Sequence, residues 1–226
     1  MDRRAQNDSE GAPPSMARTS LLRDLPTTAR GRRTRAALIE AGRRVFERLG
    51  YLDARLIDIT REANCSAGTF YTYFAGKEEI LAAILEHAQE DMMHPGMPHV
   101  TGTDDPASII EAANLAYFRA YARNAKLMAL LEQVAQIDPE FATLRQDRAD
   151  AFIRRNARGI AELQQRGLAD PELDPMLTSR ALSGMVSRLA YNYFVTGDGR
   201  LDGVAMSMTE VVRTVSRLWA NALRLA

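Results

Sequence analysis

The amino-acid sequence predicts an all-α protein, and three observations carry that prediction. Apolar residues recur at helical spacing along nearly the whole chain after residue 27, and Gly and Pro residues separate these stretches. Runs that alternate between apolar and polar residues, which are typical of strands, are absent. Residues 56–74 also have the pattern of two short helices joined by a tight turn. We therefore expect about nine helices, in an N-terminal three-helix domain with a helix-turn-helix and a larger helical C-terminal domain.

The chain begins with a polar stretch, residues 1–26, that carries several Arg, Ser and Pro residues and few large apolar ones. This composition predicts a disordered basic and polar tail. Thr27 or Thr28 is expected to cap a first helix that runs to about Leu49 and ends at Gly50. An arginine cluster lies where the tail becomes this helix, at Arg30, Arg32, Arg33 and Arg35. The cluster fits an arm that reaches a DNA minor groove and, equally well, a solvated helix start.

The helix-turn-helix pattern follows at residues 56–74. The apolar residues of the first short helix share one face, and Asn64 comes where the chain must reverse, a position that favours Gly or Asn. Ser66 is expected to cap a second short helix, from Ala67 to Phe74. The sequence therefore predicts two short helices at the spacing of a DNA-binding helix-turn-helix.

The second short helix has one apolar face and a polar surface. Phe70 and Phe74 lie four residues apart and can anchor the helix to a small core. Hydroxyl groups occupy the other positions, at Thr69, Tyr71, Thr72 and Tyr73, and Lys77 follows just beyond. A DNA phosphate backbone is a suitable partner for such hydroxyl groups and for a lysine ammonium group. We interpret the segment as a DNA-reading helix; the alternative is an ordinary two-helix corner with an aromatic-rich surface.

A wider set of residues around this segment has a characteristic spacing. The set consists of Gly50, Tyr51, Asp58, Ile59, Arg61, Glu62, Ala63, Ser66, Gly68, Thr69, Tyr71, Tyr73, Phe74, Lys77, Glu78 and Glu79. It resembles the N-terminal signature of TetR-type transcriptional repressors, over about residues 28–87. Three positions depart from the family pattern, namely Arg55 in place of a capping Thr, Ala67 in place of a frequent Lys or Arg, and Thr72 in place of a frequent His. These departures bear on the operator sequence more than on the fold.

The hydroxyl pattern and the resemblance together give a set of expected contacts with double-stranded DNA. The set is Arg33, Thr34, Arg55, Ser66, Ala67, Gly68, Thr69, Tyr71, Thr72, Tyr73 and Lys77. The charge distribution supports it, because residues 1–77 carry 14 basic and 9 acidic residues, a net +5, whereas residues 78–226 carry 15 and 20, a net −5. Phosphate neutralisation supplies most of the non-specific affinity for DNA, and the basic part of the chain is the part with the motif.

The rest of the chain is predicted to be helical. The helix-turn-helix domain is expected to span residues 27–76, a connecting helix residues 77–93, and the C-terminal domain residues 104–226, with a Pro- and Gly-containing loop at the boundary. Within the C-terminal domain the sequence predicts helices at about 105–124, 125–135, 138–166, 174–195 and 203–225, and a loop at 197–202.

The last two of these helices are apolar on more than one side. One apolar stripe can pack inward, and the other can meet its copy in a second subunit around a two-fold axis. The TetR resemblance implies a homodimer formed in this way. The expected interface residues are Leu182, Val186, Leu189, Val211, Val215, Leu218 and Trp219. Two reading helices in one dimer can recognise a palindrome, which a single short helix is too small to do.

The middle helices carry aromatic and Met residues that suit a small-molecule site. The candidate pocket residues are Tyr117, Phe118, Tyr121, Met128, Leu131, Phe152, Met185 and Tyr191. For any one of them a place in the ordinary core is the favoured alternative, whereas as a group they combine apolar surface with orienting hydroxyls. The TetR resemblance implies an inducer site here, whose small, largely apolar ligand weakens DNA binding by favouring another arrangement of the subunits.

Other functional classes find little support. The sequence contains no Gly-rich phosphate loop and no hydrolase or zinc-protease motif, so we expect neither an enzyme nor a cofactor. His87 and Asp91 form an i, i+4 pair that could share a metal ion, but His94 and His99 follow in a Pro- and Gly-containing loop without fixed geometry, so no metal site is expected. With no apolar run of membrane-spanning length, no signal sequence and one cysteine, the chain is expected in the cytoplasm. A helical dimeric scaffold without DNA binding is the alternative function.

Overall fold

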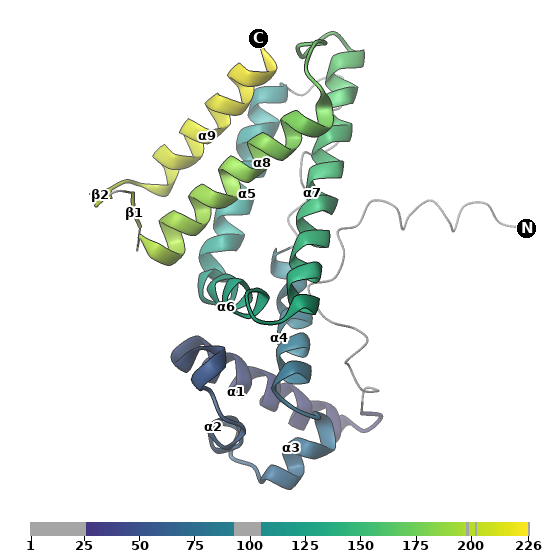
Figure 1. Ribbon diagram of the computed structural model, residues 1–226, viewed down its shortest axis with the longest axis vertical. Helices are drawn as coiled ribbons and strands as arrows, with labels where there is room; N and C mark the ends of the chain where they lie inside the picture. The colour runs from purple at the N-terminus through teal and green to yellow at the C-terminus, as the bar shows by residue number, and fades with distance from the viewer. Residues whose placement is uncertain (1–25, 93–104, 198, 202, 226) are drawn as a thin grey trace, which may run out of the picture. The chain divides into compact units, whose positions relative to one another are not determined.

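The computed structural model describes residues 26–92, 105–197, 199–201 and 203–225 (Figure 1). These residues form nine α-helices, one turn of π-helix and one short β-hairpin, which confirms the predicted all-helical fold.

The chain divides into two compact units. The N-terminal unit draws on residues 15–90 and 126–146, and the C-terminal unit draws on residues 91–125 and 147–226. Residues 126–146, placed by sequence in the C-terminal domain, therefore group with the N-terminal helices. The predicted tail at 1–25 and the loop at 93–104 lie outside the described residues.

The N-terminal unit is built on helices that share one apolar core. Its helices are α1 (Ala29–Asp53), α2 (Leu56–Glu62), α3 (Ala67–Tyr73), α4 (Lys77–Met92) and α6 (Ala125–Ala135). The largest fully buried side chains of this unit are Leu38, Phe46, Ile59, Phe70, Phe74, Ile80, Leu81, Ile84, Leu85 and Phe141. Helix α1 packs against α2 and α2 against α3, so the short helices join this core through their inner faces.

The first helix begins and breaks at residues that the sequence marks. Thr28 is the cap, since its Oγ1 accepts a hydrogen bond from the Gly31 N–H at 3.1 Å. At Gly50 the backbone leaves the helical region, with φ 78° and ψ 169°. This combination is nearly restricted to glycine. The first helix thus ends at Gly50 as predicted, and a further short helical stretch runs beyond the break to Asp53.

The C-terminal unit contains the longer helices. They are α5 (Pro106–Arg123), α7 (Pro139–Gln165), of which only the first residues belong to the N-terminal unit, α8 (Pro175–Tyr191) and α9 (Met208–Leu223). Helix α5 packs against α9 and against α8. Asp105 and Asp174 cap α5 and α8, with a proline in the first turn of each helix. These caps confirm the predicted helix starts.

Two details of this unit differ from the sequence prediction. Helix α8 passes into a π-helical turn, η2 (Asn192–Thr196), rather than ending as an α-helix. A hairpin of two strands, β1 (Arg200–Leu201) and β2 (Val204–Ala205), then occupies the predicted loop and the predicted start of the last helix. Strands of two residues are too short to show an alternating pattern. Helix α9 begins only where Ser207 and Glu210 form a capping box. None of the described helices is both long and apolar enough to cross a membrane.

Candidate nucleic-acid interface

The turn between α2 and α3 has the geometry that the sequence predicts. Asn64 adopts a left-handed conformation, with φ 51°, and the Cys65 N–H donates to the Thr60 carbonyl at 2.9 Å. Ser66 then caps α3, because its Oγ accepts from the Thr69 N–H at 3.1 Å. Burial raises the pKa of the Cys65 thiol, which is partly exposed in the turn. A reversal at Asn64 and a cap at Ser66 together fix where α3 begins.

Helix α3 has one buried edge and one open face. Phe70 and Phe74 are fully buried, with ring centroids 5.7 Å apart. On the other side Ala67, Gly68, Tyr71 and Thr72 are exposed, and the Tyr71 side chain is 51% exposed. The Phe pair thus orients α3 so that the predicted contact residues face outward.

The hydroxyl groups of α3 are more occupied than the sequence suggests. Thr72 Oγ1 donates to the Gly68 carbonyl at 3.0 Å, and Thr69 Oγ1 lies 3.0 Å from Ser66 Oγ. Tyr73 is only partly exposed, with its hydroxyl 3.6 Å from the position that a Cβ on Gly31 would take. The Thr72 and Thr69 hydroxyls therefore already have partners within the helix-turn-helix, and Thr72 has only its methyl group and its oxygen lone pairs left for further contacts.

Lys77 begins α4 beside the aromatic ring of Tyr51. Its Nζ lies 4.6 Å from the ring centroid and donates to the Leu52 carbonyl at 3.3 Å. Partial burial lowers the pKa of the Lys77 ammonium group, and the carboxylates of Glu78 and Asp53 offset part of that shift. The cation is therefore held at a defined place instead of moving freely in solvent.

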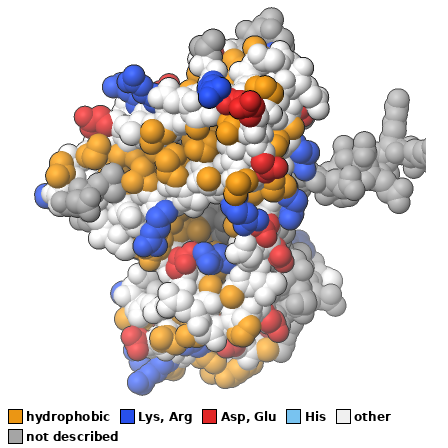
Figure 2. Space-filling view, turned by 45° about the horizontal axis from the view of Figure 1, so that its top comes forward, with side chains coloured by type: hydrophobic (Ala, Val, Ile, Leu, Met, Phe, Trp, Pro, Cys, Tyr) orange, Lys and Arg blue, Asp and Glu red, His pale blue; other side chains and the backbone are white. Residues whose placement is uncertain are grey.

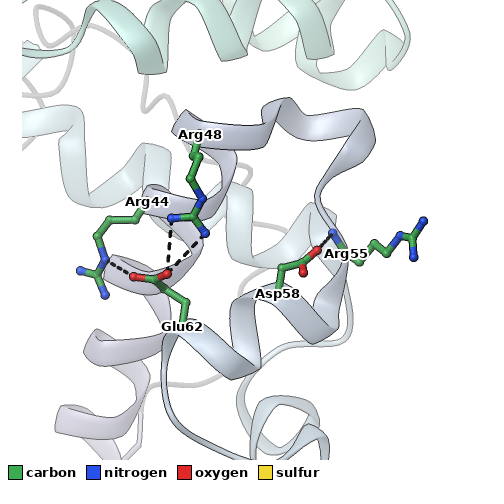
Figure 3. A network of polar contacts seen from close by, with 5 residues as sticks. All are labelled: Arg44, Arg48, Arg55, Asp58 and Glu62. Atoms are coloured by element: carbon green, nitrogen blue, oxygen red, sulfur yellow. Dashed lines mark hydrogen bonds and ion pairs between the residues drawn. The ribbon is translucent and has the colours of Figure 1, made fainter.

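The remaining predicted contacts lie at the starts of α1 and α2. Arg33 is exposed, and Thr34 donates its hydroxyl to the Arg30 carbonyl at 3.1 Å. Arg55 precedes α2 and cannot cap it with its side chain, because a guanidinium group has no acceptor atom. The Asp58 carboxylate instead accepts from the Arg55 N–H at 3.1 Å. The Arg55 side chain extends away from Asp58, which leaves the guanidinium exposed (Figure 3).

An ion-pair network ties α2 to α1 (Figure 3). Glu62 Oε1 accepts from Arg44 Nε at 2.8 Å, and Glu62 Oε2 lies 3.4 Å from Arg48 Nη2. The hydrogen bond from Arg44 is the main reason that the pKa of the Glu62 carboxyl is lowered. The sequence offers no local signal for this network, because Glu62 lies 18 residues from Arg44 and 14 residues from Arg48.

The structure divides the predicted pocket residues between the two units. Tyr117, Phe118, Tyr121, Phe152, Met185 and Tyr191 belong to the C-terminal unit. Met128 and Leu131 lie on α6 in the N-terminal unit. Within the C-terminal unit, Phe152 and Tyr191 each carry an arginine guanidinium over the ring, from Arg155 at 5.0 Å and from Arg188 at 5.6 Å. Burial, together with repulsion from Arg158, lowers the pKa of Arg155.

An aromatic cluster joins α5 to the π-helical turn. The Phe194 ring stacks on Tyr121 at 6.0 Å and lies 5.9 Å from Phe118, and Tyr117 lies 5.8 Å from Tyr121. Phe118 and Tyr121 are buried, whereas Tyr117 and Phe194 are partly exposed. Helical spacing does not mark Phe194 as part of this cluster, because the π-helical turn shifts the register on which that spacing relies.

The predicted dimer residues fall into two groups. Val186, Val211, Val215 and Trp219 are buried within the chain itself. Leu182 and Leu189 are partly exposed, and Leu218 is 46% exposed. Only this second group has side-chain surface left for a partner. Figure 2 shows hydrophobic side chains gathered in a band on the visible face of the C-terminal unit.

The side chains considered as a metal site, those of His87, Asp91, His94 and His99, lie outside the described part of the structure. Among the described side chains, no group of three or more His, Cys, Asp and Glu residues is placed to hold a metal ion.

Comparison with known proteins agrees with this geometry. The sequence profile of bacterial regulatory proteins of the tetR family matches residues 38–84. The transcriptional regulator UidR of Escherichia coli is 23% identical over 162 residues, which cover 72% of this chain and 81% of UidR. The regulator TtgR of Pseudomonas putida is 25% identical over 179 residues, which cover 76% of this chain and 85% of TtgR.

Solved structures show the same fold. The fatty acid degradation regulator FadR from Bacillus halodurans aligns with a TM-score of 0.65 at 22% identity, over 85% of this chain and 97% of that protein. SmeT, the repressor of the multidrug efflux pump SmeDEF of Stenotrophomonas maltophilia, aligns with a TM-score of 0.65 at 19% identity, over 83% of this chain and 89% of SmeT. A complex of SmeT with triclosan aligns with a TM-score of 0.66 at 19% identity, over 84% of this chain and 91% of that chain.

A helix-turn-helix with an outward-facing second helix, on an all-helical body, defines a DNA-binding transcriptional regulator rather than an enzyme. The chain belongs to the TetR family.

Proposed function

We propose that this chain is a homodimeric repressor, acting in the cytoplasm, that leaves a palindromic operator when a small, largely apolar inducer binds its C-terminal unit. The observation that carries the proposal is the orientation of α3. Its two Phe residues are fully buried, and Gly68, Tyr71 and Thr72 are exposed on the opposite side. An α-helix that is anchored on one side and open on the other is the form that enters a DNA major groove.

The contacts around α3 divide into two roles. Lys77 and Tyr71 are proposed to contact phosphates, which hold the protein on DNA without reading its sequence. Gly68 and Thr72 lie on the exposed side of α3 and are proposed to approach base edges, where a small residue and a methyl group can discriminate. Further contacts with the DNA phosphate backbone are proposed at the starts of α1 and α2, from Arg33, Thr34 and Arg55. The position of α3 and its depth in the major groove are proposed to depend on Ser66, Ala67, Thr69 and Tyr73.

The proposed dimer rests on apolar surface that the chain leaves exposed on its last two helices. Leu177 and Met176 at the start of α8 are 68% and 42% exposed, and Leu218 on α9 is 46% exposed. Leu182 and Leu189 extend this surface along α8. Exposed apolar side chains gathered on neighbouring elements are typical of a subunit interface. The other predicted interface residues, Val186, Val211, Val215 and Trp219, are buried within the chain itself.

The proposed inducer site rests on the aromatic residues of the C-terminal unit. The partly exposed rings of Tyr117 and Phe194 and the half-buried Phe152, Met185 and Tyr191 offer apolar surface with a few polar groups, which is the usual composition of a small-molecule site. SmeT, which has the same fold, has been solved in complex with triclosan. We propose a small, largely apolar ligand for this chain, held by residues of the C-terminal unit.

Selection of bound duplexes from a genomic DNA pool tests the proposal directly. We expect a palindrome whose two halves lie one helical turn apart, about 34–36 Å along the duplex, because two α3 helices of one dimer must reach successive major grooves. Light scattering on the same sample measures the dimer. A folded protein that selects no sequence would contradict the repressor proposal and favour a helical scaffold without DNA binding.

Four variants separate phosphate contacts from base contacts at α3 and at the start of α4. Lys77→Ala and Tyr71→Phe are expected to weaken binding to all duplexes alike, and Lys77→Ala should reduce the slope of log affinity against log salt by about 0.9 because one phosphate contact is lost. Thr72→Val and Gly68→Ala are expected to change which duplexes are selected. Equal loss on the selected palindrome and on random DNA for the Thr72 change would contradict its assignment to base contact.

A further inference from the structure

At the break in α1, a side chain of α6 forms a hydrogen bond with the backbone of the residue that follows Gly50. Gly50 has φ 78° and ψ 169°, and the following N–H, that of Tyr51, donates to Gln133 Oε1 at 3.2 Å. A Cβ built on Gly50 would lie 3.5 Å from the same Gln133 oxygen, so α6 approaches the break closely. Both residues belong to the N-terminal unit although 82 positions separate Tyr51 from Gln133.

Tyr51 is also the residue on which the Lys77 ammonium group rests. The Tyr51 side chain is 7% exposed and its ring packs against Phe46, with centroids 5.6 Å apart. Lys77 Nζ lies 4.6 Å from the centroid of the same ring, and the Tyr51 hydroxyl donates to Glu78 Oε1 at 3.0 Å. A single buried side chain thus contacts two successive residues at the start of α4.

The position of Lys77 therefore depends on the segment just after the break. Besides the nearby carboxylates, its ammonium group contacts the Tyr51 ring and the Leu52 carbonyl, the latter at 3.3 Å. Both contacts are made by residues 51–52, and the Gly50 conformation and the Gln133 hydrogen bond set where those residues lie. A lysine side chain that is ordered before binding loses less rotamer entropy when it reaches a phosphate.

We propose that Gln133 is a positioning residue for the Lys77 contact with DNA and acts through Tyr51. This inference rests on the proposed DNA binding and adds a route by which α6 influences it. A displacement of α6 that lengthens the Gln133–Tyr51 hydrogen bond releases the segment on which Lys77 rests. Helix α6 then controls the strength of the Lys77 contact with a DNA phosphate, in addition to any effect on the distance between the two α3 helices of the proposed dimer.

A double-mutant cycle on the full chain tests the proposal, with affinity measured for a labelled duplex pool of random sequence. Gln133→Leu removes the acceptor oxygen, and Gln133 is exposed, so its replacement opens no cavity. Lys77→Met removes the charge and keeps the side-chain length. We expect Gln133→Leu to weaken binding by roughly threefold to tenfold when Lys77 is present and by less than about 1.5-fold in the Lys77→Met background, because coupled residues are not additive.

Salt dependence supplies a second readout that a purely structural role would leave unchanged. Gln133→Leu should reduce the slope of log affinity against log salt toward that of Lys77→Met, by at most about 0.9. Gln133→Glu keeps an acceptor oxygen and should retain the slope of the original protein. The matched control is Gln136→Leu, which replaces an exposed glutamine just beyond the same helix and should change neither affinity nor slope.

The outcomes distinguish this inference from the proposal beneath it. An equal loss from Gln133→Leu in both Lys77 backgrounds would overturn the positioning role and indicate a general structural effect. An unchanged affinity for Gln133→Leu, with the original protein bound to DNA, would overturn it as well. Failure of the original protein and of Gln136→Leu to bind DNA at low salt would instead overturn the proposed DNA binding. Thermal melting shows that each variant is folded at the temperature of the measurement.

Discussion

Helix α3 and the C-terminal helices are held by polar contacts of very different reach. Around α3 the contacts are local, since Ser66 caps the N–H of a residue three positions on. In the C-terminal unit they join distant parts of the chain, as in the hydrogen bond from Asn114 Nδ2 to Ser216 Oγ, 102 residues apart, at 3.1 Å. Ser179 Oγ likewise donates to the Ile153 carbonyl, 26 residues away, at 2.8 Å.

This difference indicates where the molecule tolerates change. A segment held by local caps can alter its exposed residues without disturbing partners elsewhere, because few distant side chains depend on them. Helices that meet through buried long-range pairs must change together. The reading helix is therefore free to vary its exposed positions, whereas the packing of α5 on α9 is constrained at both ends of each contact.

The largest expected effect tests whether the reading segment is held by local contacts alone. Phe70→Ala should reduce the free energy of unfolding by about 3–5 kcal/mol, because Phe70 is fully buried and its loss leaves a cavity. Urea unfolding followed by circular dichroism measures the change. The control Tyr71→Ala removes a half-exposed ring whose edge contact is with Phe70, and it should cost no more than about 1.5 kcal/mol. A similar small effect for Phe70→Ala would mean that caps suffice to hold α3.

A smaller loss of stability is expected when the long-range hydrogen bond between Asn114 and Ser216 in the C-terminal unit is removed. Asn114→Ala should cost about 1–3 kcal/mol of unfolding free energy, because it leaves the buried Ser216 hydroxyl without its partner. Adding Ser216→Ala should cost less than the sum of the two single changes. Asn221→Ala, on the exposed side of α9, is the matched control. Additive losses would show that the pair contributes no coupling and would weaken the contrast between the two regions.

The helix cap is expected to matter less than either buried group. Ser66→Ala should reduce stability by about 1 kcal/mol, because the Thr69 N–H loses its acceptor. Ser66→Asp keeps an acceptor oxygen and should retain most of the stability, although its charge will weaken DNA binding. Thermal unfolding of the three proteins at one pH measures the difference. If Ser66→Ala and Ser66→Asp melt together, the cap is not what fixes the start of α3.

The smallest effect is expected from the exposed ion pairs that brace α2 against α1. The pKa of the Glu62 carboxyl is lowered in the folded chain, so its contribution to stability is present above the ordinary glutamate pKa and is lost as the pH falls through the lowered value. Glu62→Gln should therefore reduce stability at neutral pH, converge with the original protein in acid, and lose its effect at high salt. The exposed Glu111→Gln is the control. A difference that persists in acid would exclude the ion pairs as its source.

The sequence predicted those features that depend on neighbouring residues. The left-handed turn at Asn64 and the cap at Ser66 follow from backbone preferences of single residues, and the buried pair Phe70 and Phe74 follows from helical spacing. The contacts that join remote segments had no such signal. The hydrogen bond from Tyr51 to Gln133 and the ion pairs of Glu62 become visible only once the helices are packed.

Helical spacing also leaves open which neighbour an apolar face meets. It correctly marked α9 as strongly apolar, but Val211, Val215 and Trp219 turn toward the chain's own helices, and Leu218 does not. Similarly, residue type grouped Met128 with the aromatic residues of α5, whereas the fold places α6 in the other compact unit. Period alone identifies a buried face, and only the packing identifies its partner.

The turn between α2 and α3 carries the single thiol of the whole chain, which makes it a built-in footprinting probe. Thiolate is the reactive form, and the raised pKa of Cys65 makes alkylation slow at neutral pH and faster as the pH rises. Duplex DNA seated on α3 would shield that sulfur from a bulky alkylating reagent. The rate of modification, followed by mass spectrometry on the unaltered protein, therefore reports occupancy of the reading helix without any introduced label.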